Sequence, residues 1–392
     1  MHMPRMSRTR LGTQTTPARA ATTERHPMDL TRVRDLLQHD GPFTTVHAEV
    51  GRASEDALQQ LEARSRNIRQ QLGSAGVDER VMDEIIDRVS EQTHLPGEVR
   101  RTLVASANKV LFDDVQPGHS YWPETVDHGP LPDLAGWLTI ADRAVPFVLV
   151  VTDRTGADIE AHRALASAGV DRRTVTGADF DIRKVSAGAW AQDHYQQSAE
   201  DTWQDNARKV ADGVRSLVKS HPARAVFVAG EERARSELVT ALDVESALGD
   251  SVPLVQIQSG GRAQGASDEA MWDEIRAEVA RLEAGADEEL ANRLEEARGR
   301  GEGGATGLEQ VLQALAQARV DRLVLDLDVL HEREVRPSDH PGLALPAGVD
   351  RSRSVPADRV LVAAAALSGA DLSLLPAELS RGGGAAALLR WT

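Results

Sequence analysis

A long helix that follows a short run of small residues is the feature that most constrains how this chain folds. From Lys184 to Ser220 the sequence reads KVSAGAWAQDHYQQSAEDTWQDNARKVADGVRSLVKS. Its second half repeats an apolar residue every three or four positions, which predicts an amphipathic helix packed on one face. The residues of this stripe are Ala199, Trp203, Ala207, Val210, Val214 and Leu217. Its first half predicts a loop, 184–196, which presents a glycine, an aromatic ring and an amide at the end of a rigid helix.

The segments around this helix predict an α/β layer. FVLVVTD (147–153) and ARAVFVAG (223–230) are continuous apolar runs, typical of strands that are buried on both faces of a sheet. A helix at 231–242 and a third strand at 252–258 follow. Strands that alternate with helices form an α/β layer. We therefore expect a central α/β domain over residues 145–277.

Two further domains are expected on either side of the central one. Residues 28–144 predict an α+β domain, with a strand at 43–50, two helices within 54–92 and a hairpin at 100–115. Residues 278–392 predict a small α/β domain. Its expected elements are a helix at 306–318, a strand at 322–330, a helix and a strand within 360–375, and a last strand at 385–391. The predicted fold class is α/β and α+β, in a three-domain architecture with mixed sheets covered by helices.

The first 27 residues are basic, polar and without hydrophobic periodicity, and they are expected to form a disordered tail. They lack the apolar core of a secretory signal. Met28 is an alternative start of the chain. No apolar run approaches the roughly 20 residues of a membrane span. The absence of cysteine excludes disulfides and thiolate sites and fits a cytoplasmic protein.

The formal net charge of −16 argues against general affinity for nucleic acid. Contacts with a polyphosphate therefore have to be local. Between positions 183 and 192 the only charged residues are Arg183 and Lys184, which permits such contacts at the loop.

Two other patterns favour structural roles. Gly260-Gly261-Arg262 lies between a strand and a helix but lacks the lysine and the spacing of a phosphate-binding loop, so it predicts a connecting turn. Asp326 and Asp328 are expected two apart on one strand. They favour a strand-end carboxylate pair over a Mg²⁺ site. Scattered histidines without cysteine predict no zinc site, and no cofactor is expected.

In chain order, FVLVVTDRTGADI, the long helix, AVFVAG, TGLEQVLQALAQARVDRLVLDLD and ADLSLLPAELSRGGGAAALLRW resemble the archaeo-eukaryotic class-one release factor and Pelota superfamily. More narrowly, they resemble its bacterial branch, which includes the ribosome hibernation factor Balon. The resemblance implies three domains and a central-domain loop that reaches the peptidyl transferase centre. It also implies that the C-terminal domain meets elongation factor Tu.

The Gly-Gly-Gln triplet that release factors carry in this loop is absent. The matching place reads Gly188-Ala189-Trp190-Ala191-Gln192, which puts hydrolysis of peptidyl-tRNA in doubt. Asn67-Ile68-Arg69-Gln70 is only a partial match to the stop-codon element, so stop-codon reading is not supported.

These observations favour a ribosome-binding hibernation factor that occupies the vacant A site of the large subunit and keeps ribosomes inactive under stress. One alternative is a peptidyl-tRNA hydrolase or ribosome-rescue factor that uses Gln192. The other is an acidic adaptor that binds only proteins. The residues expected to contact rRNA at the peptidyl transferase centre are Arg183, Lys184, Ser186, Ala187, Gly188, Ala189, Trp190, Ala191, Gln192, His194 and Tyr195.

Overall fold

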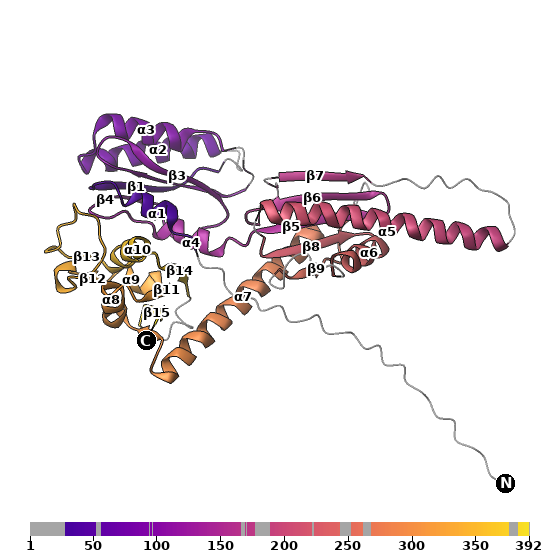
Figure 1. Cartoon of the computed structure of the whole chain (residues 1–392). Coiled ribbons are helices and arrows are strands. Elements are labelled where there is room, and N and C mark those ends of the chain that lie inside the picture. The colour runs from indigo at the N-terminus through magenta and orange to yellow at the C-terminus, as the bar shows by residue number, and fades with distance from the viewer. Residues whose placement is uncertain are drawn as a thin grey trace, which may run out of the picture.

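Among the described residues, the strands form three sheets of four or five strands and one two-stranded sheet (Figure 1). The computed structural model describes residues 28–51, 56–93, 95, 97–165, 169, 171–176, 189–221, 223–243, 252–261, 268–375 and 383–391. Each sheet is covered by helices, so the predicted fold class of mixed sheets covered by helices is confirmed. The predicted tail, residues 1–27, lies outside the described residues.

The N-terminal sheet is antiparallel, in the order β3-β2-β1-β4. Its elements are α1 (Thr31–Leu36), β1 (Phe43–Glu49), α2 (Ala57–Ser74), α3 (Glu79–Ser90), β2 (Val99–Ala105), β3 (Val110–Pro117), β4 (Thr125–Gly129) and α4 (Ala135–Arg143). Val46 and Leu103 point to one face, where α2 and α3 cover them. Phe43 and Val104 point to the other face and join a second core. Because successive side chains of a strand point to opposite faces of the sheet, β1 and β2 contribute to two cores.

The central sheet has the order β7-β6-β5-β8-β9. Its elements are β5 (Phe147–Asp153), β6 (Gly156–His162), β7 (Asp171–Thr176), α5 (Ala189–Ser220), β8 (Ala225–Gly230), α6 (Glu232–Asp243) and β9 (Leu254–Gln256). Strands β5, β8 and β9 are parallel, and β6 and β7 are antiparallel to their neighbours. Helices α5 and α6 cover one face of this sheet. Helix α7 (Asp268–Arg300) covers the other face, so β5 and β8 are buried on both faces. The continuous apolar runs predicted this correctly.

The C-terminal sheet has the order β10-β15-β11-β14. Its elements are β10 (Gly304–Thr306), α8 (Leu308–Ala316), β11 (Val320–Leu325), α9 (Leu327–Leu330), α10 (Ala357–Ser368), β14 (Asp371–Leu374) and β15 (Ala385–Leu389), and a separate pair is formed by β12 (Glu334–Val335) and β13 (Val355–Pro356). The predicted strand at 322–330 is wrong in its second half. Asp326 accepts a hydrogen bond from the N–H of Val329 and starts α9, so the strand ends at Leu325.

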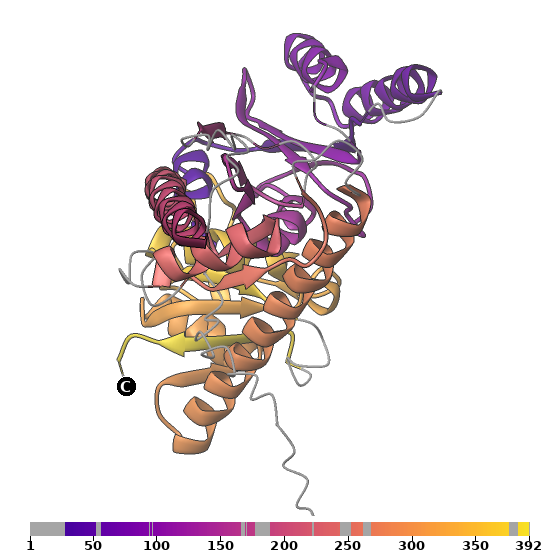
Figure 2. The same cartoon turned by 90° about the vertical axis from the view of Figure 1, so that its right-hand side faces the viewer.

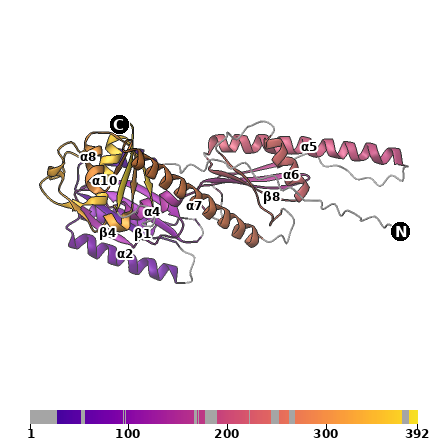
Figure 3. The same cartoon turned by 90° about the horizontal axis from the view of Figure 1, so that it is seen from below.

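Helix α7 (Asp268–Arg300) belongs to two units. Ile275 and Val279 in its first half pack on the central sheet, and Leu290 and Ala297 in its second half pack on the C-terminal sheet. Figures 2 and 3 show α7 passing from one sheet to the other. The predicted boundary at 277/278 falls inside this helix, and the predicted linker at 299–304 is partly helix and partly β10. We propose three units in the predicted order, with α7 shared by the second and the third.

The N-terminal and C-terminal units share one core. Val33 of α1, Phe43 and Trp137 are buried together with Leu323 of β11 and Val360 of α10. The sequence did not predict this shared core, because its members are far apart in the chain.

Ion pairs of Arg359 on α10 also connect the same two units. Its guanidinium donates to Asp127 at 2.7 and 3.1 Å and to Asp133 at 3.2 Å. The Arg359 side chain is 11% exposed and that of Asp133 is 2% exposed. Removal of the arginine would therefore leave two poorly solvated carboxylates without their cation.

We predict that Arg359→Ala destabilises this shared core by about 3–5 kcal/mol, the usual cost of breaking a buried ion pair. Urea unfolding followed by circular dichroism measures the shift. Arg353→Ala removes an exposed arginine six positions earlier in the chain and is expected to leave the midpoint unchanged. Equal midpoints for the two variants would contradict the proposed role of Arg359.

A second prediction concerns pH and His47 of β1. Burial, together with the charge of Arg100, lowers the pKa of His47 to about 4. In the unfolded chain the His47 imidazole takes up a proton near pH 6.5, whereas in the folded chain it stays neutral until the pH approaches 4. The free energy of unfolding is therefore unaffected by His47 above pH 6.5, and it falls by about 3 kcal/mol in total as the pH drops toward 4.

His47→Asn is expected to remove this contribution to the pH dependence, since asparagine does not titrate. The His47 imidazole is hydrogen bonded through Nδ1 to Thr102 Oγ1 at 2.8 Å, and an amide can replace that contact. The measurement is the urea midpoint of both proteins at several values between pH 7 and pH 4. Parallel curves for the two proteins would show that His47 does not carry the effect.

Candidate functional site

Helix α5 extends beyond the sheet that supports it. From Ala207 onward its apolar residues are buried against β5, β6 and β8, and they include Val210, Val214 and Leu217. Fourteen residues of the helix, 189–202, precede Trp203. At 1.5 Å per residue they span about 20 Å. Figure 1 shows α5 continuing past the ends of β6 and β7, and Figure 3 shows the same helix extending beyond the central unit. We refer to residues 189–202 as the arm.

The predicted contact residues divide into two groups. Arg183, Lys184, Ser186, Ala187 and Gly188 lie outside the described residues. The others belong to the arm, whose side chains up to position 201 are not described: Ala189, Trp190, Ala191, Gln192, His194 and Tyr195.

The predicted loop 184–196 is therefore wrong from Ala189 onward, where the helix has already begun. Alanine and glutamine are good helix formers, and neither glycine nor proline interrupts the helix after Gly188 until Gly213. Positions 190 and 194 are one turn apart, whereas position 192 is on the other side of the helix. An aromatic contact and an amide contact would thus use different sides of the arm.

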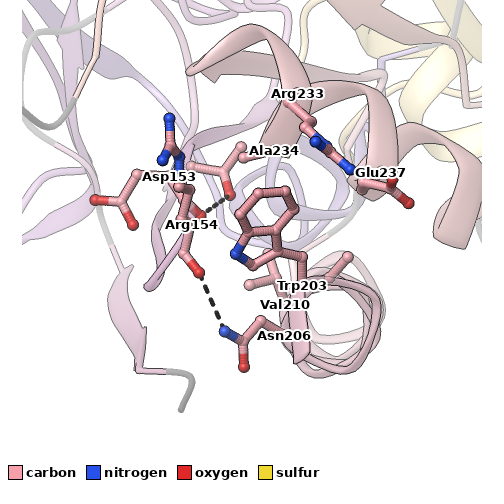
Figure 4. A pocket seen from close by; sticks show the side chains of 10 residues that line it. Asp153, Arg154, Trp203, Asn206, Val210, Arg233, Ala234 and Glu237 are labelled. Carbon is pink, nitrogen blue, oxygen red and sulfur yellow. Dashed lines mark hydrogen bonds between the residues drawn. The ribbon is translucent and has the colours of Figure 1, made fainter. Parts of the chain in front are cut away.

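A cluster around Trp203 holds the base of the arm (Figure 4). The Trp203 ring lies between two guanidinium groups, with Arg233 of α6 at 4.2 Å and Arg154 of the β5–β6 turn at 5.6 Å. Arg154 is itself paired with Glu231 at 2.7 Å. The Asn206 amide donates to the backbone oxygen of Arg154 at 3.1 Å. These contacts fix the direction in which α5 leaves the sheet.

Gly213 allows α5 to lie directly on the sheet. A Cβ atom at this position would be 2.9 Å from Ile159 of β6 and 3.0 Å from Val175 of β7. A larger residue would lift the helix at this point. Together, Gly213 and the Trp203 cluster give the arm a rigid support.

The Gly260–Gly261 segment is a structural turn, as predicted. Gly260 has a positive φ of 89° and packs on Met271. The Glu274 carboxylate accepts from the N–H groups of Gln258 and Ser259 at 2.9 to 3.0 Å. A phosphate bound at this turn would need these N–H groups as donors, but they already donate to the Glu274 carboxylate. Arg262 lies outside the described residues.

Asp326 and Asp328 line a cavity instead of forming a pair on one strand. The cavity has a volume of about 450 Å³ and lies where α4, α7 and the ends of β11 and β14 meet. Among the described residues, no group of three or more His, Asp or Glu side chains is arranged to hold a metal ion. Within the same residues, no helix is long and apolar enough to cross a membrane.

Residues 146–300 match the model of the bacterial archaeo-eukaryotic release factor family 2. This segment begins at β5 and ends with α7, so it contains the central sheet and the arm. The predicted resemblance to the release-factor superfamily is confirmed over this segment.

Proteins similar over a greater length include two uncharacterized proteins of Mycobacterium tuberculosis. Rv2629 of strain H37Rv and MT2704 of strain CDC 1551 are each 29% identical over 297 residues, which cover 75% of this chain and 77% of theirs.

Among solved structures, Pelota of Archaeoglobus fulgidus is 14% identical, covers 93% of each chain and has a TM-score of 0.32. Dom34 of S. cerevisiae is 10% identical, covers 75% of this chain and 79% of its own, and has a TM-score of 0.41. The similarity to the release-factor superfamily is shown by the family match over residues 146–300.

We predict that Trp203→Ala weakens the attachment of α5 to the sheet by about 2 kcal/mol, through the loss of two cation–π contacts and of ring burial. The measurement is urea unfolding followed by circular dichroism. Trp391→Ala removes a ring that is 53% exposed and serves as the control. If both variants unfold at the urea concentration of the unaltered protein, the cluster does not hold α5.

Proposed function

We propose that this chain, which carries the central segment of the archaeo-eukaryotic release-factor superfamily, is a ribosome-binding hibernation factor resembling Balon. It would occupy the vacant A site of the large subunit, place the arm and residues 183–188 near the peptidyl transferase centre, and keep ribosomes inactive under stress. This function places the protein in the cytoplasm. The observation that carries the proposal is the rigidly supported arm of α5.

The composition of the arm suits RNA contact without catalysis. Trp190, His194 and Tyr195 are able to stack on unpaired bases, which contributes roughly 1–3 kcal/mol per base. Arg183 and Lys184 precede the arm and are able to contact phosphates. The Gly-Gly-Gln triplet is absent, and Gln192 belongs to a helical segment. These features support a protein that blocks the site over one that hydrolyses an ester there.

The distribution of charge supports the same proposal. Helix α7 carries eleven acidic and five basic residues, whereas α5 carries five acidic and four basic residues. Much of the negative charge is thus on the helix that connects the units, and the helix that carries the arm is nearly neutral. The arm itself carries Asp193, Glu200 and Asp201 and no lysine or arginine, so the attraction to phosphate at a ribosomal contact has to come from Arg183 and Lys184.

The release-factor resemblance also suggests elongation factor Tu as a partner of the C-terminal unit. We include this contact in the proposal, and gel filtration of the two proteins together tests it. Separate elution would remove this partner and leave the ribosomal contact unaffected.

We predict that the purified protein co-sediments with vacant ribosomes at near-physiological salt. Trp190→Ala is expected to weaken binding about tenfold, since the loss of one stacked base costs about 1.4 kcal/mol or more. Arg183→Ala with Lys184→Ala is expected to reduce the salt dependence of binding. Trp391→Ala, on an exposed ring far along the chain, is the control and is expected to bind normally.

Two outcomes would overturn the proposal in different ways. Failure of the unaltered protein to sediment with ribosomes would favour an acidic adaptor that binds only proteins. Release of the nascent peptide from stalled ribosomes, lost in Gln192→Ala, would instead establish a peptidyl-tRNA hydrolase or rescue factor. Release that survives this substitution would show that Gln192 is not the catalytic amide.

A further inference from the structure

The two outer strands of the C-terminal sheet differ in how their free edges are used. On β14, the N–H of Met28 donates to the backbone oxygen of Leu372 at 2.7 Å, and Asp142 Oδ1 accepts from the N–H of Leu374 at 3.0 Å. Other parts of the chain thus occupy this edge. On the opposite side of the sheet, β10 borders a groove of about 590 Å³.

The groove lies between β10 and α8. One wall is the glycine-rich chain that leads into β10, residues 301–305. The other wall presents amide side chains at positions 310, 313 and 317, which follow one side of α8 because they are three or four residues apart. The residues of the lining outside 301–305 are Gln310, Gln313, Ala314, Gln317, Arg319 and Leu389.

The backbone of Gly304 points away from the sheet. Of the residues that flank β10, Gly303 accepts a hydrogen bond from β15 at 2.9 Å and Gly307 donates one to β15 at 2.8 Å. In an antiparallel pair, the residues between such bonded positions alternate, so the N–H and C=O of Gly304 and Thr306 are directed to the free edge. Among the described residues, neither backbone group of Gly304 has a hydrogen-bond partner.

A side chain of α8 already substitutes for a neighbouring strand at the next outward position. The Oε1 atom of Gln310 accepts from the N–H of Thr306 at 3.2 Å. The amides of this helix therefore reach hydrogen-bonding distance of the β10 edge. An extended peptide in the groove would have the open edge of Gly304 on one side and the exposed amides of Gln313 and Gln317 on the other.

The charge of Arg319 is available to a ligand. Its guanidinium donates to the side-chain oxygen of Gln317 at 3.4 Å and to the backbone oxygen of Trp391 at 3.2 Å, and both acceptors are uncharged. Its Nε atom is buried without a hydrogen-bond partner, and within the described part of the chain no carboxylate is paired with it. A carboxylate is the acceptor that a guanidinium binds most strongly. Glu302 in the same lining opposes a polyphosphate, so a single carboxylate fits this charge better.

We propose that this groove binds an extended peptide segment of a partner protein, and that the segment carries an acidic residue. Its backbone pairs with Gly304, its carbonyl groups accept from the amides of Gln313 and Gln317, and its carboxylate pairs with Arg319. The partner thus adds a short strand to the outer edge of the C-terminal sheet. The inference does not depend on ribosome binding, because the groove shares no residue with the arm of α5.

A selection of random peptides on the full chain tests the proposal. The probe is a phage-displayed library of peptides of about ten residues, which are long enough to span about 33 Å when extended. We expect the enriched peptides to have aspartate or glutamate at a fixed position and to bind as synthetic copies in fluorescence anisotropy. Methylation of the peptide nitrogen that pairs with Gly304 is expected to weaken binding about tenfold, a loss of about 1.4 kcal/mol.

Gln313→Ala and Arg319→Gln are each expected to weaken binding of these peptides about tenfold. The Gln313 side chain is exposed, so its removal leaves the fold intact. Replacement of the acidic residue of the peptide by its amide is expected to weaken binding to the unaltered chain, but not to weaken it further in Arg319→Gln.

The control is Glu309→Gln, which changes an exposed residue of α8 outside the groove and is expected to bind the peptides normally. Two results would overturn the proposal. One is a selection without any enriched peptide. The other is a set of enriched peptides that bind the Gln313→Ala and Arg319→Gln chains as tightly as the unaltered chain.

Discussion

The arrangement of the units depends on the burial of both halves of α7. Its first half covers one face of the central sheet through Met271, Ile275 and Val279, and its second half covers the C-terminal sheet through Leu290 and Ala297. A fully buried aliphatic side chain contributes about 1.5–3 kcal/mol. Each half is therefore held by several kcal/mol, and the helix acts as a rod between two sheets instead of a linker. The shared core of the N-terminal and C-terminal units gives this rod a fixed base.

The packing of α7 and α5 on the two faces of the central sheet also orients the arm. The central sheet rests on α7, α5 rests on the other face of that sheet, and the Trp203 cluster fixes where the helix departs. A protein that blocks a deep RNA site needs length and rigidity more than a catalytic group. This architecture supplies both.

Sequence patterns predicted the parts of the fold that depend on local periodicity. The runs at 147–153 and 225–230 are buried strands, and the apolar stripe from Ala207 to Leu217 is the face of α5 that packs on the sheet. Asp326 was misread because alternating leucines resemble a strand, although aspartate before a short helix is also a normal cap. The start of α5 at Ala189 was missed because the run of small residues at 186–189 indicated a loop, although alanine is also a good helix former.

Contacts between distant residues had no sequence signal. Arg359 and Asp127 are 232 positions apart, and no local pattern relates them. The same holds for Arg154, Trp203 and Arg233 at the base of the arm. For the candidate site, the sequence predicted the helix and its apolar face, while its support required the tertiary structure. The contact residues at 183–195 stay a prediction.

A density map of the protein bound to a vacant ribosome tests the central claim most directly. Our account predicts α5 within the A site of the large subunit, with the Ala189 end directed at the peptidyl transferase centre and the acidic helix α7 away from rRNA. A map with the protein bound elsewhere, or with the Ala189 end of α5 directed into solvent, would contradict it.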